Sequence, residues 1–236
     1  MININIFSDF ACPWCYIGEK RLEDAITKLG MNGDVNIYYH SFELDPNAPV
    51  DSKITSAERI ASKYNLPLER AKKKVAQIDN VGKELGLDFN YSGAIPTNTF
   101  DAHRLMKLAE QSYDTLTVQK VNKGLFDAYF TRNLLISDPK VLIEIGTNAG
   151  INESDIRNML ESDQFKEDVR NDENQAHNLG ISGVPFIILD GKVAIPGAIS
   201  TEDFMEAIVN VNNAKLKETG TACNAATCDE NGCRLN

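Results

Sequence analysis

The 236-residue chain has no apolar run long enough to cross a membrane and no excess of positive charge. A membrane-spanning helix needs roughly 20 consecutive apolar residues, and no segment approaches that length. Its 24 Lys and Arg against 34 Asp and Glu give a formal net charge of −10, which disfavours binding to nucleic acid or to anionic lipid. We therefore expect neither a nucleic-acid nor a membrane partner, but small neutral molecules or protein surfaces.

Cysteine is absent from the whole central part of the chain. Cys12 and Cys15 lie near the start, and the remaining three, Cys223, Cys228 and Cys233, lie close to the end. A small protein held together by disulfides would spread its cysteines through the fold. The two clusters are therefore interpreted as reactive groups rather than structural cross-links.

The N-terminal residues also lack the basic region and the apolar stretch of a secretory signal. On that basis we expect a cytoplasmic protein. A secreted protein whose signal peptide has been replaced by an initiator Met would begin in the same way. Hydrophobic residues make up 42% and charged residues 25% of the chain, which is ordinary for a folded protein with a core.

Hydrophobic periodicity predicts strands at both ends of the chain and helices between them. Strands are expected at residues 2–6, 35–40, 186–189 and 193–195, the last two joined by an Asp190-Gly191 hairpin turn. Helices are expected at residues 14–29, 56–63, 67–85, 98–112, 114–131, 139–149, 153–161, 163–179 and 200–212. Asn98, Asp114 and Asp138 are the expected N-caps of three of these helices.

This order of elements predicts an α/β fold in which the chain leaves a sheet and later returns to it. Residues 1–48 and 163–212 are assigned to the two halves of the sheet domain. Residues 49–162 are assigned to an inserted all-helical domain, and residues 213–236 to a Cys-rich tail. The sheet domain is therefore discontinuous in sequence.

The sequence Cys12-Pro13-Trp14-Cys15 lies between the first predicted strand and the first predicted helix. At a helix N-terminus, free backbone N–H groups and the positive end of the helix dipole favour a thiolate over a thiol. Cys12 is thus the expected nucleophile, and Cys15, one turn further and more buried, is expected to resolve the mixed disulfide. Trp14 offers a flat apolar surface to a substrate peptide.

Val184 and Pro185 come just before the third predicted strand. Proline fits a strand only at its beginning, and a peptide bond before proline can be cis. A cis bond here would present the Val184 backbone to an extended substrate. An ordinary turn proline is the alternative interpretation.

Five segments together resemble the DsbA-like thioredoxin-fold proteins of the FrnE subgroup. They are FSDFACPWCYIG (7–18), FELDP (42–46), NTFDAHRL (98–105), GISGVPF (180–186) and IPGA (195–198). The resemblance covers about residues 1–210 and implies a thioredoxin-like fold with an inserted all-helical domain. It also implies that Cys12 and Cys15 form a redox dithiol, and that Val184 and Pro185 form a cis-proline substrate site.

The expected function is therefore thiol–disulfide exchange, with protein disulfides, protein dithiols or glutathione as the partners and no bound metal or other cofactor. The same superfamily contains 2-hydroxychromene-2-carboxylate isomerases and kappa-class glutathione transferases, which have Ser where this chain has Cys12. A glutathione-dependent isomerase or transferase acting on a small aromatic substrate is the first alternative. A zinc-holding interaction module, using Cys12, Cys15 and the tail cysteines, is the second.

The tail cysteines Cys223, Cys228 and Cys233 are five residues apart, so successive thiols would lie about 140° apart on an ideal helix. Three interpretations stay open: an auxiliary redox pair serving Cys12 and Cys15, thiols of a frayed tail, and metal ligands. Among the other polar residues, Asp9 is expected either to cap the turn before Cys12 or to repel its thiolate. Glu19 is a second acid flanking the two cysteines, and the three histidines are expected to be structural.

Overall fold

The computed structural model describes residues 1–218. Its centre is a mixed sheet with the strand order β2-β1-β3-β4. The strands are β1 (Ile2–Ser8), β2 (Val35–Ser41), β3 (Phe186–Leu189) and β4 (Val193–Pro196). β1 pairs in parallel with β2 and antiparallel with β3. The central strand is therefore bonded to strands from both ends of the chain, as the sequence predicts.

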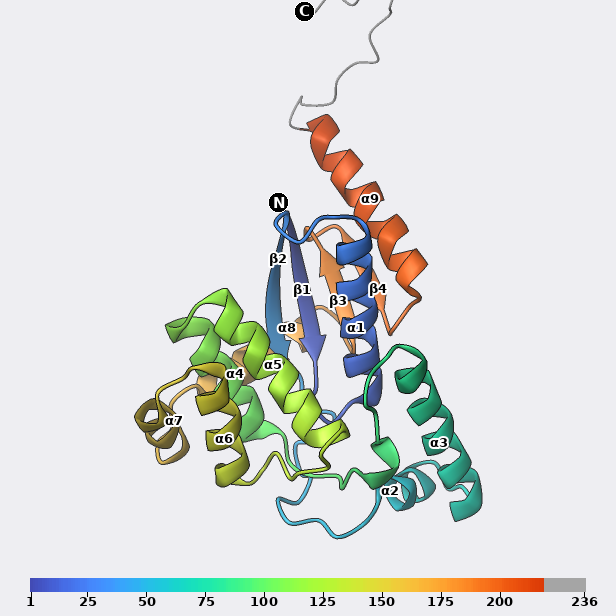
Figure 1. The fold of residues 1–236 in the computed structure, drawn as a ribbon, viewed down its shortest axis with the longest axis vertical. Helices are drawn as coiled ribbons and strands as arrows, with labels where there is room; N and C mark the ends of the chain where they lie inside the picture. Colours follow the sequence, from blue (N-terminus) through green and yellow to red (C-terminus); the bar gives the residue numbers. More distant parts are fainter. Residues whose placement is uncertain (219–236) are drawn as a thin grey trace, which may run out of the picture.

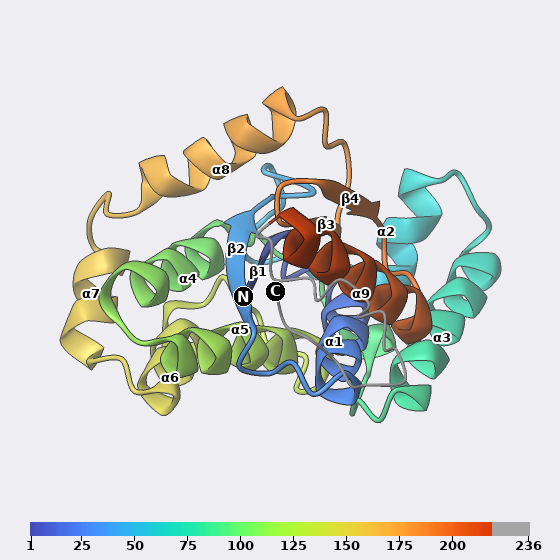
Figure 2. The ribbon, with the colours of Figure 1, turned by 90° about the horizontal axis from the view of Figure 1, so that it is seen from above.

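Helices cover both faces of this sheet. α1 (Pro13–Lys28) and α9 (Thr201–Glu218) lie on one face and α8 (Lys166–Asn178) on the other (Figures 1 and 2). The period of two in β1 explains the layers, because alternate side chains point to opposite faces. Ile2, Ile4 and Ile6 share a buried cluster with residues of α1 and α9, whereas Phe7 packs with residues of α8 and β3.

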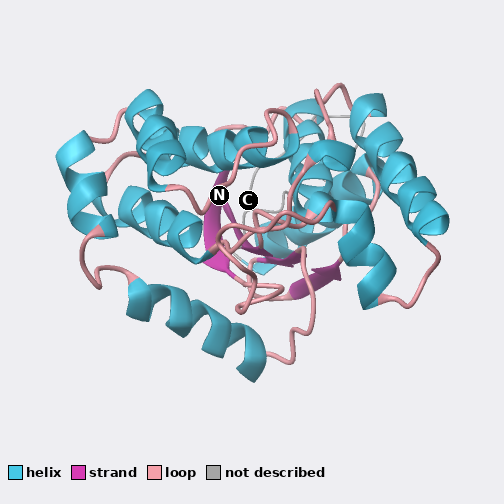
Figure 3. Ribbon diagram, turned by 90° about the horizontal axis from the view of Figure 1, so that it is seen from below, coloured by secondary structure: helices cyan, strands magenta, loops and turns pink. Residues whose placement is uncertain are grey.

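The segment between β2 and α8 is helical. It contains α2 (Ser56–Lys63), α3 (Leu68–Glu84), the 3₁₀ turn η1 (Tyr91–Gly93), α4 (Phe100–Ser112), α5 (Thr115–Phe130), α6 (Pro139–Ala149) and α7 (Glu153–Leu160). Seen from below, these helices surround the sheet (Figure 3). α4 to α7 lie on one side of the N-terminal end of α1, and α2 and α3 on the other (Figure 1).

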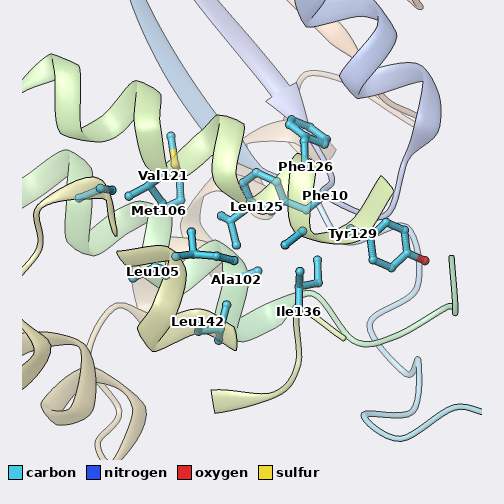
Figure 4. Packing of buried hydrophobic residues seen from close by; sticks show 14 of the residues in the cluster. Phe10, Ala102, Leu105, Met106, Val121, Leu125, Phe126, Tyr129, Ile136 and Leu142 are labelled. Carbon is cyan, nitrogen blue, oxygen red and sulfur yellow. The ribbon is translucent and has the colours of Figure 1, made fainter. Parts of the chain in front are cut away.

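The largest hydrophobic cluster of residues 1–218 lies within these helices and extends to the start of α1. Phe10, in the loop before α1, packs against Phe126 of α5 with ring centroids 5.1 Å apart (Figure 4). Cys12, Cys15 and Tyr16 belong to the same cluster. The loop that carries the two cysteines is thus fixed by the inserted helices as well as by the sheet.

Three helix boundaries differ from the sequence prediction by two residues or more, whereas Asp114 and Asp138 cap α5 and α6 as expected. α8 begins at Lys166 rather than at residue 163. The N-cap of α4 is Thr99 rather than Asn98, whose side chain accepts a hydrogen bond from the Phe100 backbone instead. α9 continues to Glu218 instead of ending at residue 212. Lys215 explains the extension, because its Nζ bonds the Asp190 carboxylate and the Met1 carbonyl oxygen.

Arg104 of α4 links that helix to the connection between α7 and α8. Its side chain is 2% exposed. The guanidinium donates to the backbone carbonyl oxygens of Gln164 at 2.8 Å and Ser162 at 2.6 Å, and also to that of Met159. Arg104 also forms an ion pair with Asp101 at 2.8 Å.

No helix within residues 1–218 is long and apolar enough to span a membrane.

Candidate active site

Cys12 occupies the N-cap of α1, where the backbone is extended. Its N–H donates to the Asp9 carbonyl oxygen at 2.9 Å, and Pro13 follows at the first helical position, where its missing N–H costs no hydrogen bond. The thiol lies 3.5 Å from the carbonyl oxygen of Val184. The Val184–Pro185 peptide bond is cis. The structure therefore brings together predicted site residues from opposite ends of the chain.

Cys15 lies behind Cys12, one turn into the helix. It is fully buried, its N–H donates to the Cys12 carbonyl oxygen at 3.1 Å, and both thiols are free. Burial raises the pKa of the Cys15 thiol well above its usual range, and the adjacent Cys12 sulfur adds to the increase. Hydrogen bonds from the Asp9 backbone and the Ser8 side chain act in the opposite direction. Cys12 is itself only 4% exposed, against 0% for Cys15, so the first sulfur is slightly more accessible than the second.

Trp14 is the exposed member of the sequence between the cysteines, with 40% of its surface accessible. It borders a groove of about 240 Å³, whose other wall is α3, with the lining residues Lys74, Gln77, Ile78 and Val81. Within residues 1–218 the Lys74 ammonium forms no ion pair or hydrogen bond with another residue. The groove beside Trp14 therefore combines apolar side chains with the positive charge of Lys74.

Gly18 allows α1 to approach the segment around Pro185. A Cβ atom at this position would lie 3.2 Å from Pro185 Cγ and 3.2 Å from Ala198 Cβ. Arg21, also on α1, donates from Nη1 to the Ala198 carbonyl oxygen at 2.8 Å. The backbone N–H of Gly197 donates to the Pro185 carbonyl oxygen at 2.8 Å. These contacts set the position of Val184 relative to the cysteines.

Asp9 caps the turn that leads into Cys12. Its carboxylate accepts hydrogen bonds from the backbone of Ala11 at 3.1 Å and of Leu44 at 2.7 Å. This confirms the capping interpretation. Burial alone would raise the pKa of Asp9, but His103, 3.7 Å away, and the two backbone donors bring the pKa below its usual value.

Glu19 lies one turn after Cys15 on the same helix and contacts two other elements. Its Oε1 accepts a hydrogen bond from Ser8 Oγ of β1 at 2.9 Å, and its Oε2 accepts one from Asn122 Nδ2 of α5 at 2.6 Å. Burial raises the pKa of Glu19 to about 7, although both hydrogen bonds lower it. The sequence predicts Glu19 as an acid flanking the two cysteines, but no local pattern predicts its burial.

A small cavity lies next to Ser8 and Asn122, the two hydrogen-bond partners of Glu19. Its volume is about 10 Å³, and it is lined by Ser8, Phe10, Tyr39, His40, Ser41, His103, Met106 and Asn122. Two buried atoms in its lining have no hydrogen-bond partner in residues 1–218, namely His103 Nε2 and Asn122 Oδ1. His40 is structural as expected, since its ring nitrogens lie 3.0 Å from Asp172 and 2.9 Å from Asn5. His103, in contrast, lies at the site.

The signals for Ser8 and Glu19 are present in the sequence. Ser8 continues the alternation of the isoleucines in β1, which places it on the face that α1 covers. Glu19 follows Cys15 by four residues, which is one helical turn. Asn122 has no comparable signal, because its polar side chain interrupts an otherwise apolar helix face.

Comparison with known proteins decides the family. The model of the DSBA-like thioredoxin domain matches residues 3–209. The chain belongs to this DSBA-like family. The predicted thioredoxin-like fold with inserted helices is thereby confirmed.

Several proteins are similar to this DSBA-like chain over nearly its whole length. The Bacillus subtilis protein YwbO is 24% identical and covers 91% of the chain and 99% of its own length. A probable DsbA oxidoreductase from Streptomyces coelicolor has a TM-score of 0.83, 27% identity and full coverage of both chains. A 2-hydroxychromene-2-carboxylate isomerase has a TM-score of 0.64, 14% identity and coverage of 93% and 99%. The cytosolic disulfide reductase DsbM from Pseudomonas aeruginosa, solved with glutathione, has a TM-score of 0.59, 14% identity and coverage of 92% and 99%.

Residues 1–218 of the DSBA-like protein contain no cluster of three or more His, Cys, Asp or Glu side chains placed to hold a metal ion. The tail cysteines Cys223, Cys228 and Cys233 lie outside the described residues. Their predicted roles, as an auxiliary redox pair or as metal ligands together with Cys12 and Cys15, stay predictions.

Proposed function

We propose that this DSBA-like protein is a thiol–disulfide oxidoreductase in which Cys12 is the nucleophile and Cys15 the resolving thiol. The observation that supports the proposal best is the position of Cys12, at a helix N-cap and 3.5 Å from the Val184 carbonyl oxygen, with Cys15 buried behind it. A helix N-terminus favours a thiolate, and a buried second thiol is protected from competing partners.

The reaction proceeds by two exchanges. Cys12 thiolate attacks one sulfur of a substrate disulfide, and the other substrate sulfur leaves as a thiol after taking a proton. Cys15 then attacks Cys12 in the mixed disulfide, so that the second substrate thiol is released and a Cys12–Cys15 disulfide remains. The substrate is reduced and the enzyme dithiol is oxidised by the same two electrons. The reverse sequence oxidises a substrate dithiol.

Trp14, Val184 and Pro185 are proposed to bind the substrate chain. An extended peptide laid across the Val184 backbone gains main-chain hydrogen bonds, while Trp14 contributes exposed apolar area beside the nucleophile. Glutathione is proposed as the redox partner that recycles the dithiol, with support from the neighbour DsbM, which was solved with it. The proposal includes a cytoplasmic location, where the dithiol would rest reduced and act as a reductase or isomerase.

The test follows reduction of insulin disulfides with glutathione as the electron source, in the full chain and in two variants. Cys12→Ser should abolish the activity, and Cys15→Ser should accumulate a mixed disulfide on Cys12 that mass spectrometry detects. A variant with Ser at the three tail positions is the matched control, and it should retain the Cys12-dependent reaction. Unchanged insulin reduction in Cys12→Ser would contradict the proposal.

The same experiment separates the alternative suggested by the fold shared with the 2-hydroxychromene-2-carboxylate isomerase. A glutathione-dependent isomerase binds glutathione in a saturable way and leaves insulin disulfides intact. That result, obtained with the wild-type chain, would favour the isomerase over the oxidoreductase.

A further inference from the structure

The end of β4 is joined to the segment around Pro185 by a single main-chain hydrogen bond. β3 and β4 are antiparallel, with Phe186 opposite Pro196, so Pro185 and Gly197 form the next pair. The Gly197 N–H donates to the Pro185 carbonyl oxygen at 2.8 Å. A pair of this kind normally exchanges two such bonds, but Pro185 has no N–H to give in return. The backbone that carries Val184 is therefore held here by half the usual number of bonds.

Arg21 of α1 holds the chain that follows Gly197. Its Nη1 donates to the carbonyl oxygen of Ala198 at 2.8 Å and to that of Ile199 at 3.3 Å. Among residues 1–218, no other group donates a hydrogen bond to either oxygen. Hydrogen bonds from a charged donor are stronger than those between neutral groups. The Arg21 guanidinium thus supplies, from the helix, an attachment in place of the bond that Pro185 cannot make.

Arg21 and Cys12 lie at two positions of the same helix, about two and a half turns apart. Each contacts one of the two joined segments. The Cys12 thiol lies 3.5 Å from the Val184 carbonyl oxygen, and Arg21 bonds the two carbonyl oxygens after Gly197. Gly18, between them, has no side chain that would push the segments away from the helix. Because α1 is rigid, its two contacts fix where the Val184 backbone lies relative to the nucleophile.

The position of the Val184 backbone affects two classes of substrate differently. A disulfide in a polypeptide is flanked by an extended main chain that can pair with free backbone groups. Its sulfur would therefore reach Cys12 in a position set by Val184. A small aromatic disulfide has no main chain and meets Cys12 through its sulfur atoms alone.

We propose that Arg21 determines a preference for polypeptide disulfides over small disulfides, because it holds the segment after Gly197 and, through it, the Val184 backbone. Arg21 is a positioning residue, since it touches neither the substrate nor a reacting sulfur. Its bonds keep Gly197 beside Pro185, and Pro185 keeps Val184 in place next to Cys12. The inference rests on the proposed binding of substrate at Val184.

The positioning role is tested without any substrate. Arg21→Met removes the guanidinium, whereas Lys20→Met is the control, because it removes a neighbouring positive charge whose partner, Asp24, lies on the same helix. Amide hydrogen exchange of Gly197, followed by NMR in the full chain, reports on its bond to Pro185. We expect exchange about tenfold faster in Arg21→Met, the equivalent of one lost hydrogen bond to a charged group, and no change in the control.

The preference is tested with two probe substrates, insulin and the aromatic disulfide of thionitrobenzoate. All proteins carry Ser at the three tail cysteines, so that only the Cys12–Cys15 pair reacts. In Arg21→Met, kcat/KM for insulin reduction should fall about tenfold, while the rate at which Cys12 releases the first thionitrobenzoate should match that of Lys20→Met. Arg21→Lys, which keeps a charged donor, should recover part of the insulin rate. A loss of overall stability would change both rates by the same factor, so the ratio of the two rates carries the test.

Three outcomes would count against these proposals. The same ratio of rates in Arg21→Met and Lys20→Met would overturn the inference, as would unchanged exchange of the Gly197 amide. A reference protein without any Cys12-dependent reaction toward either substrate would overturn the oxidoreductase proposal, and the specificity role of Arg21 with it. The Gly197 exchange, which needs no substrate, separates that last outcome from a failure of the Arg21 contact itself.

Discussion

The Cys12 thiol and the Val184 carbonyl oxygen are 3.5 Å apart, although 172 positions separate the two residues in the sequence. This contact joins the start of the first helix to the start of β3. It depends on the close approach of α1 to Pro185 at Gly18 and on the pairing of β1 with β3. The position of the Val184 backbone relative to Cys12 is therefore sensitive to changes in α1.

Gly18→Ala should reduce activity more than it reduces stability. The added Cβ would lie 3.2 Å from both Pro185 Cγ and Ala198 Cβ, so the Val184 segment must shift by a few tenths of an ångström. Helix propensity favours Ala by about 1 kcal/mol, which offsets the strain in the free energy of unfolding. We expect kcat/KM for insulin reduction to fall roughly tenfold. Gly33→Ala is the control, because no atom lies within 4 Å of its added Cβ; equal activity of the two variants would show that the Gly18 contact has no effect on the site.

Glu19→Gln should stabilise the protein at alkaline pH. The folded pKa of Glu19, about 7, exceeds its unfolded value near 4.5, so folding binds a proton between these values and stability falls as pH rises through the window. Gln does not titrate and avoids that loss. We expect the variant to exceed the wild type by about 3 kcal/mol in unfolding free energy above pH 7, with no gain below pH 4.5. Urea titrations at the two pH values measure the difference, and a gain independent of pH would contradict it.

Arg104→Met should destabilise the protein strongly. The substitution removes the donor to the carbonyl oxygens of Gln164, Ser162 and Met159, of which only the Met159 contact is fully buried. A buried acceptor without a partner costs about 1–3 kcal/mol, so a loss of about 2–3 kcal/mol is expected from denaturant titration. The control is Arg157→Met, which removes an exposed ion pair to Glu153 and should cost less than about 1 kcal/mol. Similar losses in both variants would argue against a structural role for Arg104.

Lys74→Glu should alter the choice of substrate. Lys74 lines the groove beside Trp14 and has no acidic partner in residues 1–218, so a carboxylate on the substrate would complete the site. We expect kcat/KM for a disulfide peptide with an acidic flank to fall about two- to fivefold, the value of an exposed ion pair. A neutral peptide should be unaffected. Lys73→Glu changes the same charge outside the groove lining and serves as the matched control; an equal decrease there would indicate only long-range attraction.

The sequence predicts most of the fold because its local patterns are strong. The alternation of Ile and Asn in β1, the caps at Asp114 and Asp138, and the proline before β3 each follow from backbone chemistry. The two cysteines are predicted to lie at a helix start for the same reason. These inferences do not require knowing which helices and strands contact one another in the folded protein.

The rest depends on contacts between distant elements, which local patterns do not encode. Asn122 reaches Glu19 only because α5 packs beside the first turns of α1, where Phe126 stacks on Tyr16. His103 approaches Asp9 only because α4 packs on the loop before Cys12. The elevated pKa of Glu19 is a property of that assembled environment. Sequence spacing can place an acid on the right helix face, but it does not reveal what covers that face.

The strand order has a consequence for synthesis on the ribosome. β1 and β2 emerge early, yet the second edge of β1 is covered only by β3, after the inserted helices have been translated. At typical elongation rates this delay is on the order of ten seconds, during which β1 presents an unpaired edge to other nascent chains. Most residues of the largest hydrophobic cluster, which also includes the start of α1, are translated before β3. A chaperone that holds the first forty or so residues would therefore protect a part of the fold that cannot be finished in order of translation.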